Sequence, residues 1–117
     1  MDGFDECLHD LVAYNGSLQI AHWRANTVTN EHKTLGDLYD SMTSLTDSLA
    51  ETFMGKYGVI DFVSNIVLED VSDEPVSKGL TIVNDLYSYM TDKDDDLVNI
   101  IADMEIALNK AKYLLKE

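Results

Sequence analysis

One stretch of the sequence has a hydrophobic period that restricts the fold strongly. Between residues 35 and 53, large apolar side chains recur at steps of 3, 4, 3, 4 and 4, in the order Leu35, Leu38, Met42, Leu45, Leu49 and Phe53. This spacing is typical of an amphipathic α-helix that buries one stripe of its surface. Asn30 has the side chain of an N-cap, and Gly55 favours an end of the helix. A helix with one apolar stripe has to pack against other elements.

Three further stretches show a helical period. Residues 4–23 have an imperfect stripe that Gly16 weakens, residues 76–91 follow a turn at 72–75, and a last helix follows the acidic run at 92–96. Their apolar positions are Leu8, Leu11, Val12, Leu18 and Ala21, then Leu80, Val83, Leu86, Tyr87 and Met90, then Leu97, Ile100, Ile101, Met104, Leu108, Ala111 and Leu115. Residues 59–71 are apolar and rich in β-branched side chains, which fits a short helix or an extended crossover. The pattern predicts an all-α protein, an antiparallel four-helix bundle with a long crossover between its second and third helices, as a single domain over residues 1–117.

Charge and cysteine content restrict the classes of function. The chain has 22 acidic and 8 basic residues and a formal net charge of −14. Such a surface repels nucleic acids and anionic membranes and attracts cations, although a soluble acidic surface explains the same composition. Cys7 is the only cysteine, so we expect no internal disulfide and a cytoplasmic location. We expect neither a secretory signal, because the N-terminal stretch is acidic, nor a membrane span, because no apolar run approaches ~18 residues.

A polar face runs beside the apolar stripe of the helix expected after Asn30. At 100° per residue with Leu35 at zero, His32, Asp47 and Glu51 lie near about 60°, 120° and 160°. Asp47 and Glu51 are one turn apart, so their carboxylates can converge on one ion. His32 and Asp47 are separated by ~22 Å of helix rise, so they cannot bind the same ion within one chain. His22 ends the preceding helix and can join His32 across the short loop.

Two antiparallel copies of this helix remove the difficulty. If they cross near residues 40 and 41 about a two-fold axis, His32 of one chain lies level with about residue 49 of the other. Gly36 and Thr43 are small and share this face, which favours close approach. The contact creates two identical candidate metal clusters, each made of His22, His32, Asp47 and Glu51. Acidic pairs one turn apart and histidines at helix ends are also common as structural residues, so the spacing alone leaves both readings open.

Two segments resemble a known family. Residues 22–51, "HWRANTVTNEHKTLGDLYDSMTSLTDSLAE", look like the first two helices of Dps-type mini-ferritins, and "DLVNIIADMEIALNKAKYLL" at 96–115 resembles their last helix. The resemblance implies a ferritin-like bundle with a ferroxidase site at a two-fold interface between subunits, which binds iron and oxidises Fe(II) with peroxide or oxygen. The matching ligands are His22, His32, Asp47 and Glu51. Such proteins form homo-oligomers, typically of twelve subunits, and often bind DNA.

The sequence departs from the family pattern at several points. The family has an aspartate four residues after the second histidine, where this chain has Gly36, and Asp37 points away near about 200° on the helical wheel. Losing that carboxylate is expected to weaken metal binding or remove a second ion. The chain has no lysine-rich tail and a charge of −14, so we expect no DNA binding and a homodimer or higher homo-oligomer. Mixed imidazole and carboxylate ligands suit iron, and also zinc or manganese.

The alternative is a degenerate ferritin-like bundle that serves as a non-catalytic structural or interaction module, which Gly36 favours. The compact chain also resembles small proteins of tailed bacteriophages, for which the cytoplasm is that of the host. We interpret Trp23 as a core anchor rather than a shield of the site, and His9 as a solvated or capping residue. The acids at 92–96 fit the dipole of the last helix better than a calcium loop, and Tyr39, Tyr87, Tyr89 and Tyr113 fit core edges or interfaces.

Overall fold

The protein is built from four α-helices. The computed structural model describes residues 2–63 and 65–117, and the helices are α1 (Asp2–Arg24), α2 (Asn30–Tyr57), α3 (Ser77–Ser88) and α4 (Asp95–Leu115). The described residues contain no β-strand. The prediction of an all-α protein with four helices is confirmed. No helix in the described part of the chain combines the length and the apolar character that crossing a membrane requires.

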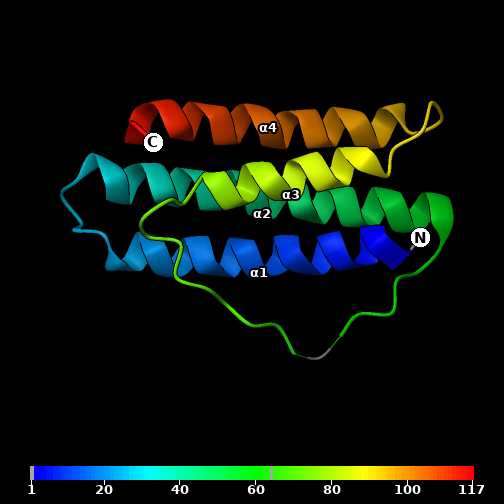
Figure 1. Cartoon of the computed structure of the whole chain (residues 1–117), viewed down its shortest axis with the longest axis horizontal. Coiled ribbons are helices and arrows are strands. Elements are labelled where there is room, and N and C mark those ends of the chain that lie inside the picture. Colours follow the sequence, from blue (N-terminus) through cyan, green and yellow to red (C-terminus); the bar gives the residue numbers. More distant parts are fainter. Residues whose placement is uncertain (1, 64) are drawn as a thin grey trace.

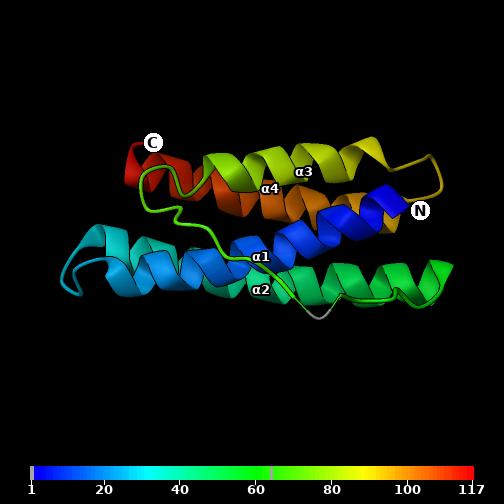
Figure 2. The same cartoon turned by 60° about the horizontal axis from the view of Figure 1, so that its bottom comes forward.

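The helices form one bundle in which every packed neighbour runs antiparallel. Contacts join α1 to α2, α2 to α4, α4 to α3 and α3 to α1. The chain runs along α1, turns and returns along α2, and then passes back along the outside of the bundle. Helix α3 next runs in the same direction as α2, and α4 in the same direction as α1, as Figures 1 and 2 show. Helices α2 and α3 therefore point the same way, and the connection between them spans the length of the bundle. We call residues 59–71 of this connection the crossover.

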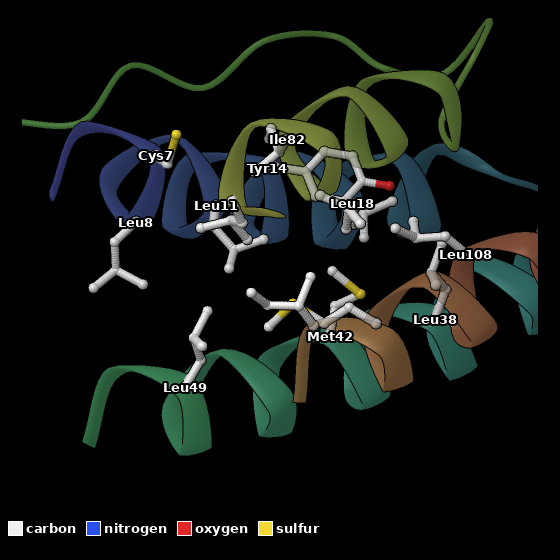
Figure 3. Packing of buried hydrophobic residues seen from close by; sticks show 14 of the residues in the cluster. Cys7, Leu8, Leu11, Tyr14, Leu18, Leu38, Met42, Leu49, Ile82 and Leu108 are labelled. Carbon is white, nitrogen blue, oxygen red and sulfur yellow. The ribbon is translucent and has the colours of Figure 1, made fainter. Parts of the chain in front are cut away.

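The apolar stripe that the sequence predicts for α2 forms one wall of the core. Leu35, Leu38, Met42, Leu49 and Phe53 are buried, whereas Leu45 lies at the edge of the core. Figure 3 shows how side chains from the other helices meet this wall, among them Leu8, Leu11, Tyr14 and Leu18 of α1, Ile82 of α3 and Leu108 of α4. Burial of these side chains supplies the main driving force for folding, because each large aliphatic side chain removed from water contributes roughly 2 kcal/mol.

The ends of the helices differ in detail from the predictions. The N-cap of α2 is Thr29 rather than Asn30, and the Thr29 hydroxyl accepts a hydrogen bond from the amide of His32 at 3.1 Å. Asn30 instead donates its side-chain amide to the carbonyl of Leu114 in α4. Helix α2 continues two residues past Gly55 and stops before Gly58, whose φ of 103° suits glycine. The prediction missed Thr29 because Thr29 and Asn30 are adjacent and both have side chains that can cap a helix.

The crossover contains no helix among its described residues, which decides between the two alternatives left by the sequence. It lies along α1. The amide of Val63 donates to Nε2 of His9 at 3.1 Å, and the amide of Glu69 donates to the hydroxyl of Ser17 at 3.0 Å. The crossover therefore follows α1 through side chains of that helix rather than through a regular hydrogen-bond ladder.

Candidate metal centre

His22 and His32 face each other across the turn that joins α1 to α2. Nδ1 of His22 lies 2.6 Å from the carbonyl oxygen of His32, and Nδ1 of His32 lies 2.8 Å from the carbonyl oxygen of His22. The two rings stack with their centroids 3.9 Å apart and an interplanar angle of 26°. The sequence prediction that these histidines meet within one chain is confirmed by this geometry.

The reciprocal hydrogen bonds fix the tautomer of both rings. A carbonyl oxygen can only accept, so each Nδ1 carries a hydrogen. In a neutral imidazole the hydrogen on Nδ1 leaves a lone pair on Nε2. Within the described residues, neither Nε2 takes part in a hydrogen bond. Metal-binding histidines are commonly oriented in this way, with one nitrogen donating to a carbonyl while the other faces the ion.

Gly36 is in contact with the His22 ring, one turn after His32. A Cβ atom built on Gly36 would lie 2.7 Å from Cε1 and 3.0 Å from Nδ1 of His22. Such distances are too short for any side chain while His22 keeps this orientation. The glycine that departs from the mini-ferritin pattern therefore makes room for the stacked histidine. Our expectation that Gly36 favours close approach between two chains needs correcting, because His22 of the same chain covers it.

Asp37 lies away from the histidines, as the helical wheel predicted. Its carboxylate pairs with Lys33 at 2.8 Å. It also lines a groove of about 310 Å³ between α2 and α4, whereas the histidines lie between α1 and α2. Asp37 therefore cannot replace the carboxylate that Gly36 lacks.

Asp47 and Glu51 lie on the exposed surface of α2, one turn apart. They follow His32 by fifteen and nineteen residues, or about 22 and 28 Å of helix rise. Among the described residues of the single chain, no three histidine, cysteine, aspartate or glutamate side chains are close enough to hold one metal ion. The structure thus brings together His22 and His32 and leaves the two acids remote from them.

Two residues have surroundings that the sequence did not indicate. Trp23 is 65% exposed, so its interpretation as a core anchor is wrong. His9 was interpreted as solvated or capping, and it holds the crossover: Nδ1 donates to the carbonyl of Asp5 at 2.7 Å and Nε2 accepts from the amide of Val63. No local pattern announces this role, because the partner is 54 residues away.

The four candidate ligands lie within a segment that a known family matches, which extends over residues 22–115. The chain belongs to DUF5856, a family of unknown function. The first matched residue is His22. No curated protein and no solved structure matches this DUF5856 protein.

Proposed function

We propose that this DUF5856 protein is a metal-binding homo-oligomer of the ferritin-like type, with an iron site shared between two chains. His22 and His32 of one chain supply two imidazole nitrogens, and Asp47 and Glu51 of another supply carboxylates. The observation that carries the proposal is the reciprocal histidine clamp. It stacks the two rings with their centroids 3.9 Å apart and leaves the Nε2 lone pair of each ring free to bind an ion, because each Nδ1 carries the hydrogen.

The distance between the histidines and the acids points to a second chain. If two α2 helices cross antiparallel near residues 40 and 41, His32 of one lies level with about residue 49 of the other, between Asp47 and Glu51. Both acids are exposed, and neither forms an ion pair in the described part of the chain. They are thus available to a partner. One two-fold contact produces two equivalent sites.

The course of the chain supports the ferritin-like assignment. Ferritin-like bundles have four helices with one long crossover connection, and here the long connection follows α2 and makes α2 and α3 parallel. The resemblance of residues 22–51 and 96–115 to Dps-type mini-ferritins falls on three of these four helices. We therefore propose that the protein is related to the mini-ferritins. We also propose a cytoplasmic location, because Cys7 is the only cysteine of the chain.

The chemistry that suits the donor set is oxidation of bound Fe(II). Imidazole and carboxylate ligands bind iron in both oxidation states, and they also bind zinc and manganese. Iron is here the substrate: each Fe(II) loses one electron to dioxygen or peroxide. The residues of the protein bind and orient the ion, and the Nδ1–carbonyl hydrogen bonds keep both imidazoles from rotating.

The rival function is that of a bundle without metal chemistry, which acts as a structural or interaction module. The contact between Gly36 and the His22 ring favours it, because it excludes the further carboxylate of the family pattern. A site with two imidazoles and two carboxylates still has enough donors for one ion, so we prefer the metal-binding function.

Three variants separate the two functions. In His22→Asn/His32→Asn, each asparagine keeps an N–H donor near the Nδ1 position and lacks Nε2. Asp47→Asn/Glu51→Gln removes the carboxylates at almost constant shape. Asp92→Asn/Asp103→Asn is the control, because it removes two negative charges elsewhere on the surface. Fe(II) is titrated without oxygen by calorimetry and then with oxygen by Fe(III) absorbance.

We expect both site variants to lose the binding isotherm and the Fe(III) signal, and the control to keep them. Mixing the two site variants as refolded chains restores about a quarter of the sites, because half of the random dimers are mixed and each contains one complete site. Absence of Fe(II), Zn(II) and Mn(II) binding by the wild-type chain contradicts the metal site and leaves the rival function.

A further inference from the structure

The largest group of exposed apolar side chains lies on the crossover. The valines at 59 and 67 are 90% and 82% exposed. Phe62, Val63, Ile66 and Leu68 are also exposed, although less fully. Exposed apolar groups this numerous on one segment mark a contact with another molecule in many proteins. We call these six residues, together with Trp23, the apolar strip.

The crossover is fastened to α1, so the strip has a defined shape. Besides the hydrogen bonds of Val63 and Glu69, the Phe62 ring meets the His9 ring edge-on at a centroid distance of 5.5 Å. Leu68 lies over Gly16 so closely that a Cβ atom there would be 2.9 Å from Leu68 Cδ2. A surface ordered before binding loses less conformational entropy when a partner docks.

Trp23 extends the strip toward the end of α1. His9, Gly16 and Trp23 follow each other at intervals of seven residues, so they lie on the same side of the helix. The crossover covers the first two, and Trp23 remains 65% exposed. Figure 2 looks onto this side, where the crossover passes in front of α1 and α2. Tryptophan is typical of the energetically dominant part of protein interfaces, and phenylalanine is enriched in their buried core.

The low charge of the apolar strip indicates which partner it binds. Asp61 is the one ionisable residue among residues 59–68. The two acids that follow are neutralised, since Glu69 pairs with Lys78 at 2.8 Å and Asp70 with Arg24 at 3.0 Å. The strip is thus nearly neutral on a chain with a net charge of −14. Two copies of such a chain repel each other where their acidic surfaces meet, and this repulsion is weakest where the two strips meet.

Other partners fit the strip less well. Nucleic acids and anionic membranes need basic groups, and the sequence of residues 59–68 contains no lysine or arginine. A basic protein would be attracted to the acidic faces of the bundle instead. We infer that the apolar strip binds the same strip of a second copy of this chain, and that this contact forms a homodimer without any metal.

Two charge-matched variants test this interface. Val59→Asp/Val67→Asp places two carboxylates on the strip at positions that contribute little to the fold of one chain. Val28→Asp/Tyr113→Asp is the control, because these side chains are 88% and 81% exposed and lie in the α1–α2 loop and on α4. Sedimentation equilibrium gives the dimer dissociation constant for each. We expect the wild type and the control to associate as dimers and the strip variant to dissociate at least tenfold more readily.

Trp23 supplies a second readout, because it is the only tryptophan. Dilution of the wild type through the dissociation constant is expected to shift its emission to longer wavelength as water reaches the indole. Equal dissociation constants for strip variant and control, or a wild type that stays monomeric at all concentrations, overturn the inference. A dimer that depends on the strip but binds no Fe(II) contradicts the proposed metal site alone. A dimer that binds Fe(II) and ignores the strip substitutions contradicts this inference alone.

Discussion

His22 and His32 each donate a hydrogen bond from Nδ1 to the backbone carbonyl of the other. His32 thus supplies a donor to a carbonyl in the last turn of α1, which lacks a partner within its helix, and His22 adds a second bond to a carbonyl in the first turn of α2. The pair closes the turn between the two helices. Because the same two bonds select the tautomer of both rings, the structural role and the proposed ligand role do not compete. A histidine pair can belong to the fold and still present two nitrogens to an ion.

A substitution at Gly36 tests how tightly the two histidines are packed. Alanine normally stabilises a helix by about 1 kcal/mol relative to glycine. At residue 36 we expect Gly36→Ala to lower the free energy of unfolding by roughly 1–2 kcal/mol, because its Cβ displaces the His22 ring and its hydrogen bond. Urea unfolding followed by circular dichroism measures the change.

Gly55→Ala is the matched control for this substitution. Gly55 lies in the same helix, and a Cβ atom there meets nothing within 4 Å. We expect it to raise the free energy of unfolding by about 0.5–1 kcal/mol. If Gly36→Ala is as stabilising as Gly55→Ala, the position of the His22 ring does not depend on a glycine at residue 36.

The helices were predictable from the sequence because their apolar period is strong. The stripe from Leu35 to Phe53 defines which side of α2 is buried, and the same period places α1 and α4. The histidine pair was predictable because a short loop between antiparallel helices brings their ends together. Even the direction of Asp37 followed from the helical wheel.

What the sequence left open depends on contacts between distant residues. Trp23 has the size and position of a core anchor, yet it lies on the side of α1 that the helices do not cover. The conformation of the crossover is decided by His9 and Ser17, more than fifty residues away in the chain. Gly36 looked like a lost ligand, and only the position of the His22 ring shows why no side chain fits.

Asp94 ties the end of α2 to the start of α4. Its fully buried carboxylate accepts hydrogen bonds from the Tyr57 hydroxyl and the Thr91 amide, and it pairs with Lys56 at 3.0 Å. The Tyr57 hydrogen bond above all holds the pKa of Asp94 well below its usual range, with further help from Thr91 and Lys56 and against the effect of burial. We expect Asp94→Ala to lower the free energy of unfolding by roughly 2 kcal/mol at neutral pH, because it removes a charged acceptor and the hydrogen bonds that join it to α2 and Thr91.

The same carboxylate makes the stability depend on pH. A depressed pKa in the folded state means that the contribution of Asp94 is complete above the ordinary aspartate pKa of about 4 and is lost as the pH falls below it. Denaturant unfolding between pH 7 and pH 3 therefore shows a smaller loss for Asp94→Ala than for the wild type. The exposed Asp92→Ala keeps the wild-type dependence. If the free energy of unfolding depends on pH in the same way for Asp94→Ala and the wild type, the hydrogen bonds of Asp94 do not have this role.

Glu117 caps a helix that has no side-chain cap of its own. Its carboxylate accepts hydrogen bonds from the amides of Val76 and Ser77 at the start of α3, at distances of 2.8 to 3.1 Å. A carboxylate at this end also complements the helix dipole. We expect Glu117→Ala to lower the free energy of unfolding by about 1 kcal/mol, and Asp103→Ala, an exposed acid within α4, to leave it nearly unchanged. Equal thermal stability of the two variants would argue against the cap.

Cys7 is expected to react slowly while the protein is folded. The thiol is buried in the core, and burial together with the nearby acids Asp85, Asp10 and Glu6 raises its pKa to about 11. At pH 8 the thiolate fraction is then ~100-fold lower than for an ordinary cysteine, and the thiolate is the reactive species. Absorbance after addition of an aromatic disulfide reagent follows the reaction. We expect it to be at least ~100-fold slower for the native chain than for the chain in urea. Equal rates in the native chain and in the chain in urea would mean that the part of the core around Cys7 opens freely. That result would conflict with the packing of α1 against α2 and α3.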